Sequence, residues 1–93
     1  MGWRDLVKAA DSEAKVLDLA TRFVASFSVE ELERLPPALR PGAFRTADEL
    51  RAYAHRLVRY DADSTDGATR LALRLSSVIS AATARLQELT AKA

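Results

Sequence analysis

Apolar side chains recur along the last third of the chain with the spacing of an α-helix. At 100° per residue they occupy about a third of the helix circumference. They are Ala68, Leu71, Ala72, Leu75, Val78, Ile79, Ala82, Leu86 and Leu89. The pattern predicts a long amphipathic helix over about 65–90 that turns this face to a core.

Three shorter apolar stripes predict helices at about 2–10, 13–27 and 47–60. The first consists of Trp3, Leu6, Val7, Ala10 and Ala14, and the second of Val16, Leu17, Ala20, Phe23, Val24 and Phe27. The third consists of Leu50, Tyr53, Ala54, Leu57, Val58 and Tyr60. The first two stripes are rotated by about a quarter turn from each other, so one straight helix could not press both on the same neighbour. We therefore expect a break near Asp11 and Ser12, two residues that favour helix starts.

Helix-start signals and prolines mark the remaining boundaries. Ser28 with Glu31, and Thr46 with Glu49, fit the capping box and predict a short helix at about 29–35 and the start of the helix at 47. Asp63 or Ser64 is expected to cap the last helix. Three prolines interrupt helix over the Pro-rich turn 36–45, where the apolar side chains between them predict a segment pinned to the bundle.

These elements predict an all-α fold in a single helical domain over 1–93. We expect a compact antiparallel bundle of three main helices plus one or two short helices. Composition agrees, because Ala and Leu, both strong helix formers, fill 31 of the 93 positions, with only three Gly and three Pro.

Residue inventory argues against catalysis and cofactors. The chain has no Cys and one His, so thiol catalysis, zinc fingers and iron–sulfur clusters are excluded, and no glycine-rich phosphate loop or Gly-x-Ser-x-Gly motif occurs. The acidic segment 61–67 resembles an EF-hand loop only superficially, because Ala72 stands where the closing Glu would be. We expect no enzyme activity, no cofactor and no metal site.

The early charges and the short apolar runs of the chain predict its cellular location. Charges begin at Arg4 and Asp5, which does not fit a secretory signal, and apolar runs are too short to span a membrane. A cytoplasmic protein without membrane contact is expected. Eleven Arg against three Lys is consistent with a GC-rich bacterial source.

Two surfaces carry the functional hypothesis of a protein–protein interaction module (an adaptor, regulator or assembly subunit). On the last helix, Ser76, Ser80 and Thr83 form a face of small residues with Leu73 beside it, which could receive another helix. On the second helix, Leu19 belongs to a wide apolar arc that predicts self-association, as in a homodimer. The candidate partner-binding residues are Leu73, Ser76, Ser80 and Leu19.

The alternative function is weak phosphate binding by a nucleic-acid-associated protein. Its candidate contacts on and before the helix at 47–60 are Arg45, Arg51, His55, Arg56 and Arg59. A helix-turn-helix reader is excluded, because ten residues with three prolines separate Leu35 from Thr46. With a net charge of only +1, nucleic acid is the less favoured partner.

Overall fold

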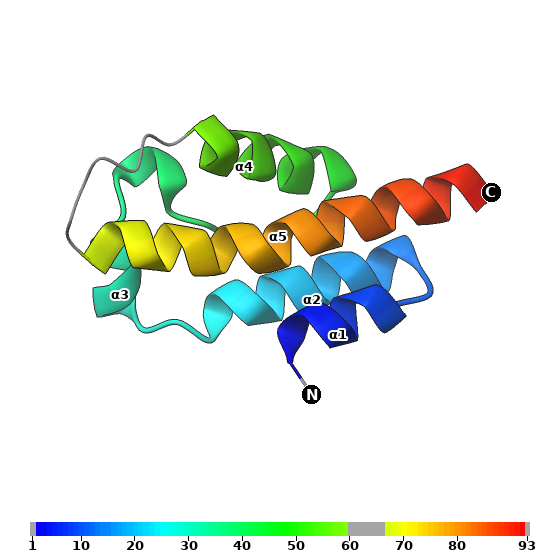
Figure 1. Ribbon diagram of the computed structural model, residues 1–93, viewed down its shortest axis with the longest axis horizontal. Coiled ribbons are helices and arrows are strands. Elements are labelled where there is room, and N and C mark those ends of the chain that lie inside the picture. The colour runs from blue at the N-terminus through cyan, green and yellow to red at the C-terminus, as the bar shows by residue number, and fades with distance from the viewer. Residues whose placement is uncertain (1, 60–66, 93) are drawn as a thin grey trace.

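The computed structural model describes residues 2–59 and 67–92, which contain no strand and fold as an all-α bundle (Figure 1). The predicted fold class is therefore confirmed. In chain order the elements are α1 (Trp3–Ala9), α2 (Glu13–Ala25), α3 (Val29–Glu33), the 3-10 helix η1 (Pro37–Leu39), α4 (Ala47–Arg59) and α5 (Gly67–Lys92).

Helix α5 is the centre of the bundle. It packs against α1, α2 and α4, with α4 along one side and α1 and α2 along the other (Figure 1). Helices α2 and α4 run antiparallel to α5, whereas α1 runs parallel to it. The predicted apolar face forms the core contact, since seven of its members are buried: Leu71, Ala72, Leu75, Val78, Ile79, Ala82 and Leu86.

The predicted break between the first two helices is confirmed. Ala10 and Ser12 have extended backbones, and the Ser12 hydroxyl accepts a hydrogen bond from the Lys15 N–H at 3.2 Å, which caps α2. The change of direction lets both apolar stripes reach the core, because Val7 and Val16 are each fully buried.

Local hydrogen bonds explain where α3 and α4 begin. The Ser28 hydroxyl accepts from the Glu31 N–H at 3.1 Å, and the Ser28 N–H donates to the Glu31 carboxylate at 3.0 Å, so this capping box is confirmed. The bond from the Ser28 N–H lowers the pKa of the Glu31 carboxyl. At α4, Thr46 accepts from the Glu49 N–H, but the Glu49 carboxylate accepts from the N–H of Arg45 instead of Thr46.

The proline segment is pinned to the bundle, as its apolar residues predicted. Two of its side chains, Leu39 and Phe44, are buried, and so is Leu35 directly before it. The Tyr53 hydroxyl donates to the Leu39 carbonyl at 2.8 Å, and the Phe44 N–H donates to the Thr21 hydroxyl at 3.0 Å. These bonds join the segment to α4 and α2 and satisfy backbone groups that the turn leaves without helical partners.

Replacing Tyr53 by Phe tests this anchor. Loss of the hydroxyl leaves the Leu39 carbonyl without its donor and should lower the free energy of unfolding by about 1–2 kcal/mol at neutral pH. Burial also raises the pKa of the Tyr53 hydroxyl above its ordinary value. The folded chain thus keeps a proton that the unfolded chain releases above about pH 10, so stability should fall as pH rises past that point. Urea unfolding between pH 8 and 11 should show a shallower fall for Tyr53→Phe than for the wild type, and equal slopes would contradict this role.

Several boundaries differ from the prediction, as do three side chains of the predicted stripes, one of which is the exposed Ala14. Helix α2 ends at Ala25 instead of residue 27. Helix α3 ends at Glu33 instead of residue 35, because Leu35 precedes a proline and is biased away from helix. The turn contains the unpredicted η1, and α5 continues to Lys92. Leu6 and Val58, assigned to core stripes, are 36% and 73% exposed. The proposed caps Asp63 and Ser64, Tyr60, and the acidic segment up to Asp66 lie outside the described residues.

Candidate functional site

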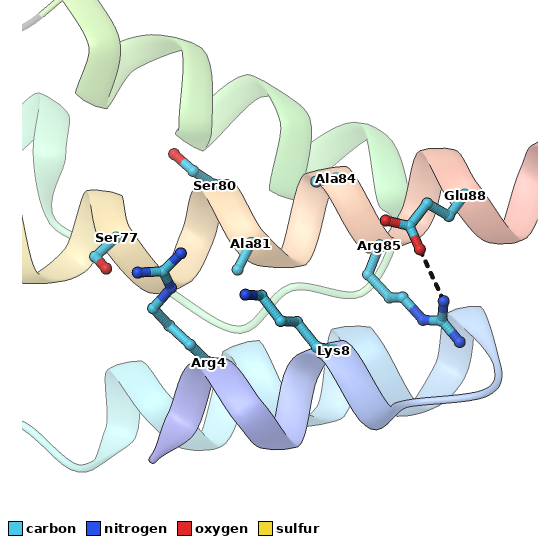
Figure 2. A pocket seen from close by; sticks show the side chains of 8 residues that line it. All are labelled: Arg4, Lys8, Ser77, Ser80, Ala81, Ala84, Arg85 and Glu88. Atoms are coloured by element: carbon cyan, nitrogen blue, oxygen red, sulfur yellow. Dashed lines mark hydrogen bonds and ion pairs between the residues drawn. The ribbon is translucent and has the colours of Figure 1, made fainter.

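The solvent face of α5 consists mainly of short side chains. Ser77, Ser80 and Ala84 are exposed and Ala81 and Thr83 are half-buried. Residues three, four and seven apart lie along one line of a helix, so these positions form a continuous strip (Figure 2). Short side chains allow the backbone of another helix to approach closely.

Helices α1 and α4 stand on either side of the strip and make it a trough. A depression of about 400 Å³ lies between α1 and α5, walled by Arg4 and Lys8, whose side chains project toward α5 (Figure 2). Two further depressions, of about 220 and 490 Å³, lie along the side of α5 that faces α4. Because Ser80 and Ala84 each line depressions on both sides, we treat the three depressions as one feature, the α5 trough.

Positive charge dominates the walls of the α5 trough. Its cationic side chains are Arg4, Lys8, Arg51 and Arg85, with His55 beside Arg51. Glu88 is the one carboxylate lining these three depressions among the described residues, and the Arg85 guanidinium pairs with it at 2.9 Å. A neighbouring depression that shares Arg4, Lys8 and Ser77 is also lined by Asp5 and Arg74. Arg51 contacts Asp48 at 3.4 Å, at an almost fully exposed carboxylate. Arg4 and Lys8 have no ion-pair partner in the described part of the chain.

Arg85 has a second contact that fixes the α1 wall. Its Nε donates to the Ala10 carbonyl at 2.7 Å, at the turn between α1 and α2. The side chain is 17% exposed, so this charged hydrogen bond is partly shielded from water. Arg85 therefore ties the end of α1 to α5.

The four predicted partner-binding residues do not form one surface. Ser80 lies on the trough floor, and Leu73 is 65% exposed on α5, one turn before Ser77. Ser76 is half-buried and lines none of the three depressions, and Leu19 is half-buried and packed against the core. The apolar arc that suggested self-association is covered by other parts of the same chain, because Val16, Phe23 and Phe27 are all buried.

The predicted phosphate-binding residues are divided between roles. Arg51 and His55 line the α5 trough, and Arg59 is exposed at the end of α4. The Arg56 Nε donates to the Ala38 carbonyl at 3.0 Å, and its guanidinium lies 5.6 Å from the Tyr53 ring centre. Arg56 is therefore a structural anchor of the proline segment. Arg45 precedes α4 and lines none of the three depressions.

Arg4 and Lys8 were not among the residues selected from the sequence. The signal available was their spacing of four, which places them on one side of α1. What the spacing could not give is the neighbour of that side, because the rotation of α1 depends on how Trp3 and Val7 pack. The Trp3 ring lies 5.7 Å from the Phe23 ring, and Val7 is fully buried.

No group of three or more His, Cys, Asp or Glu among the described residues could hold a metal ion, and no buried side-chain nitrogen or oxygen among them lacks a hydrogen-bond partner. His55 is exposed on the wall of an open trough. None of the helices described is both long and apolar enough to cross a bilayer.

A scan against protein-family models and searches of curated proteins and of solved structures found no match to this chain. The shape and charge of the α5 trough are thus the basis for a functional proposal.

Proposed function

We propose that this chain is a helical protein–protein interaction module that receives a helix of another protein in the α5 trough. The observation that carries the proposal is the strip of short side chains on the central helix, flanked on both sides by neighbouring helices. Packed helices lie about 8–10 Å apart, and the distance is shortest where small residues meet. A trough floored by Ser and Ala suits such an approach.

Leu73 extends the same line toward the start of α5. It lies four residues before Ser77 and is 65% exposed, so a helix along the strip would cover it. The described helices otherwise bury most of their large apolar residues, which makes Leu73 and Val58 on the α4 wall the main apolar groups available near the trough. Covering them would add to the binding free energy in proportion to the apolar area removed from water.

A second copy of this chain is a less suitable occupant of the trough. A hollow face does not fit a copy of itself, and a symmetric pairing would bring Arg4, Lys8 and Arg51 near their own equivalents. Self-association through Leu73 stays a prediction. Sedimentation equilibrium would detect it as a mass of two chains that falls to one in the Leu73→Arg variant.

Nucleic-acid binding, the alternative drawn from the sequence, has weaker support. Arg56 is held by the Ala38 carbonyl and Arg51 contacts Asp48, so two of the five residues already have partners. Methyl groups of Ala81 and Ala84 on the floor offer phosphates no hydrogen bond. A helix with an apolar stripe could contact the floor with its apolar side chains and the walls with its polar ones.

Ala84→Trp tests the proposed site. The probe is a displayed library of helices of about twenty residues that share an Ala/Leu contact stripe and vary at the flanking positions. An indole at position 84 would fill the trough, so helices selected on the wild type should bind the variant at least about tenfold more weakly. Stability should change by no more than about 0.5 kcal/mol, because Ala84 is exposed.

Ala14→Trp provides the matched control. Ala14 is exposed on α2 and lines none of the three depressions, so the same selected helices should keep their affinity for it. Helices that bind the wild type and Ala84→Trp equally well would show that the trough is not the binding site.

A further inference from the structure

We infer that the helix received by the α5 trough is acidic along both flanks of its contact stripe. This inference rests on the proposed function and adds the chemistry of the partner. It starts from the four cationic side chains and the single, already paired carboxylate that line the three depressions.

Basic side chains stand in two rows, one on each wall, with two cations on α1 and the cation of Arg51 beside the imidazole of His55 on α4. Arg4 and Lys8 are four residues apart on α1, which places them one turn apart on the same side of that helix. Arg51 and His55 repeat the spacing on α4 and line the opposite side of the trough. A helix lying between the rows would meet both with carboxylates spaced three or four residues apart on its two flanks.

The positive charge is a local property of the trough. The whole chain carries a formal net charge of only +1, and residues 11–33 hold six acidic and two basic side chains. Those residues belong to α2 and α3 and the segments beside them, which line none of the three depressions. A partner selected by charge would therefore be directed to the trough and away from α2 and α3.

Arg4 and Lys8 are the best placed to recognise a carboxylate. Arg85 and Arg51 each have a partner, whereas neither side chain on α1 is paired within the described residues. Binding would not require these two cations to give up an existing ion pair. The floor beside them contributes the Ser77 hydroxyl and the methyl of Ala81, and the Ser80 side chain lies toward α4 (Figure 2). An acidic amphipathic helix matches both the charged wall and the small floor, whereas a polyanion without an apolar stripe matches only the wall.

The helix library tests this inference when its flanking positions encode Glu, Lys and Gln at equal frequency. Selection on the full chain should enrich Glu over Lys at these positions. The selected helices should bind the Arg4→Glu/Lys8→Glu variant about tenfold or more weakly, and affinity should fall as salt is raised. The control is Lys15→Glu/Arg22→Glu, which changes net charge equally on the exposed face of α2 and should leave binding within about twofold of the wild type.

The outcomes separate this inference from the proposed function. Helices blocked by Ala84→Trp but rich in Lys or Gln at the flanks would overturn the acidic partner and leave the trough as the binding site. Selected helices insensitive to Ala84→Trp would overturn the proposed function itself. If a DNA duplex displaces the selected helices when both supply the same concentration of negative charge, the trough would be a site for polyanions in place of a helix site.

Discussion

Replacing Ile79 by Ala lowers the free energy of unfolding by about 3 kcal/mol and the melting temperature by about 15 °C, and this is the largest stability effect expected from a single change on α5. Ile79 is fully buried among the core residues, at the centre of the helix that packs against α1, α2 and α4. Its truncation leaves a cavity that three helices would have to close together. Thermal and urea unfolding followed by circular dichroism measure the effect.

Leu73→Ala provides the comparison on the same helix. Leu73 is 65% exposed, so removing its methyl groups should change stability by no more than about 0.5 kcal/mol. The contrast separates the core face of α5 from the face assigned to the partner. A loss at Leu73 close to that at Ile79 would mean that Leu73 is covered in solution, and it would favour self-association through that residue.

The helices could be predicted because their signals are local. The apolar face of α5 repeats with the helical period, and the Ser28–Glu31 box depends on two residues three apart. The failures are also informative. Val58 continues the apolar stripe of α4 but is 73% exposed, because it lies on the wall that faces the trough. Periodicity identifies which positions share a face, but it does not show how far a neighbouring helix extends over them.

The candidate site could be predicted only in part for the same reason. The small-residue face of α5, including Ser80, was visible in the sequence, since it requires only one helix. The α1 wall was not, because Arg4 and Lys8 join the site only through the packing of α1 beside α5. The neighbours of Leu19 likewise depend on packing, since its apolar arc is covered by the chain's own helices, which the sequence pattern of one helix does not show.

Arg85→Met is expected to lower the free energy of unfolding by about 1.5–3 kcal/mol, the second largest effect on stability. Methionine keeps much of the alkyl stem but removes the Nε–H that donates to the Ala10 carbonyl at 2.7 Å. No other hydrogen bond to that carbonyl is present among the described residues, and Ala10 is 4% exposed, so its oxygen would lose its donor in a largely dry place. Because α1 has only seven residues, the substitution should speed the exchange of its amides with solvent more than it speeds the exchange of the α5 amides.

Glu88→Ala distinguishes the two contacts of Arg85. The Glu88 carboxylate is 61% exposed, and an ion pair of this kind contributes about 0.5 kcal/mol or less. If Glu88→Ala costs as much as Arg85→Met, the lost stability comes from the ion pair within α5 and not from the bond to Ala10. If only Arg85→Met is costly and the selected helices also bind it less well, the same side chain stabilises the bundle and positions Arg4 and Lys8. That result would link the stability of the α1 wall directly to partner binding, since a loosened α1 would carry its two cations away from α5.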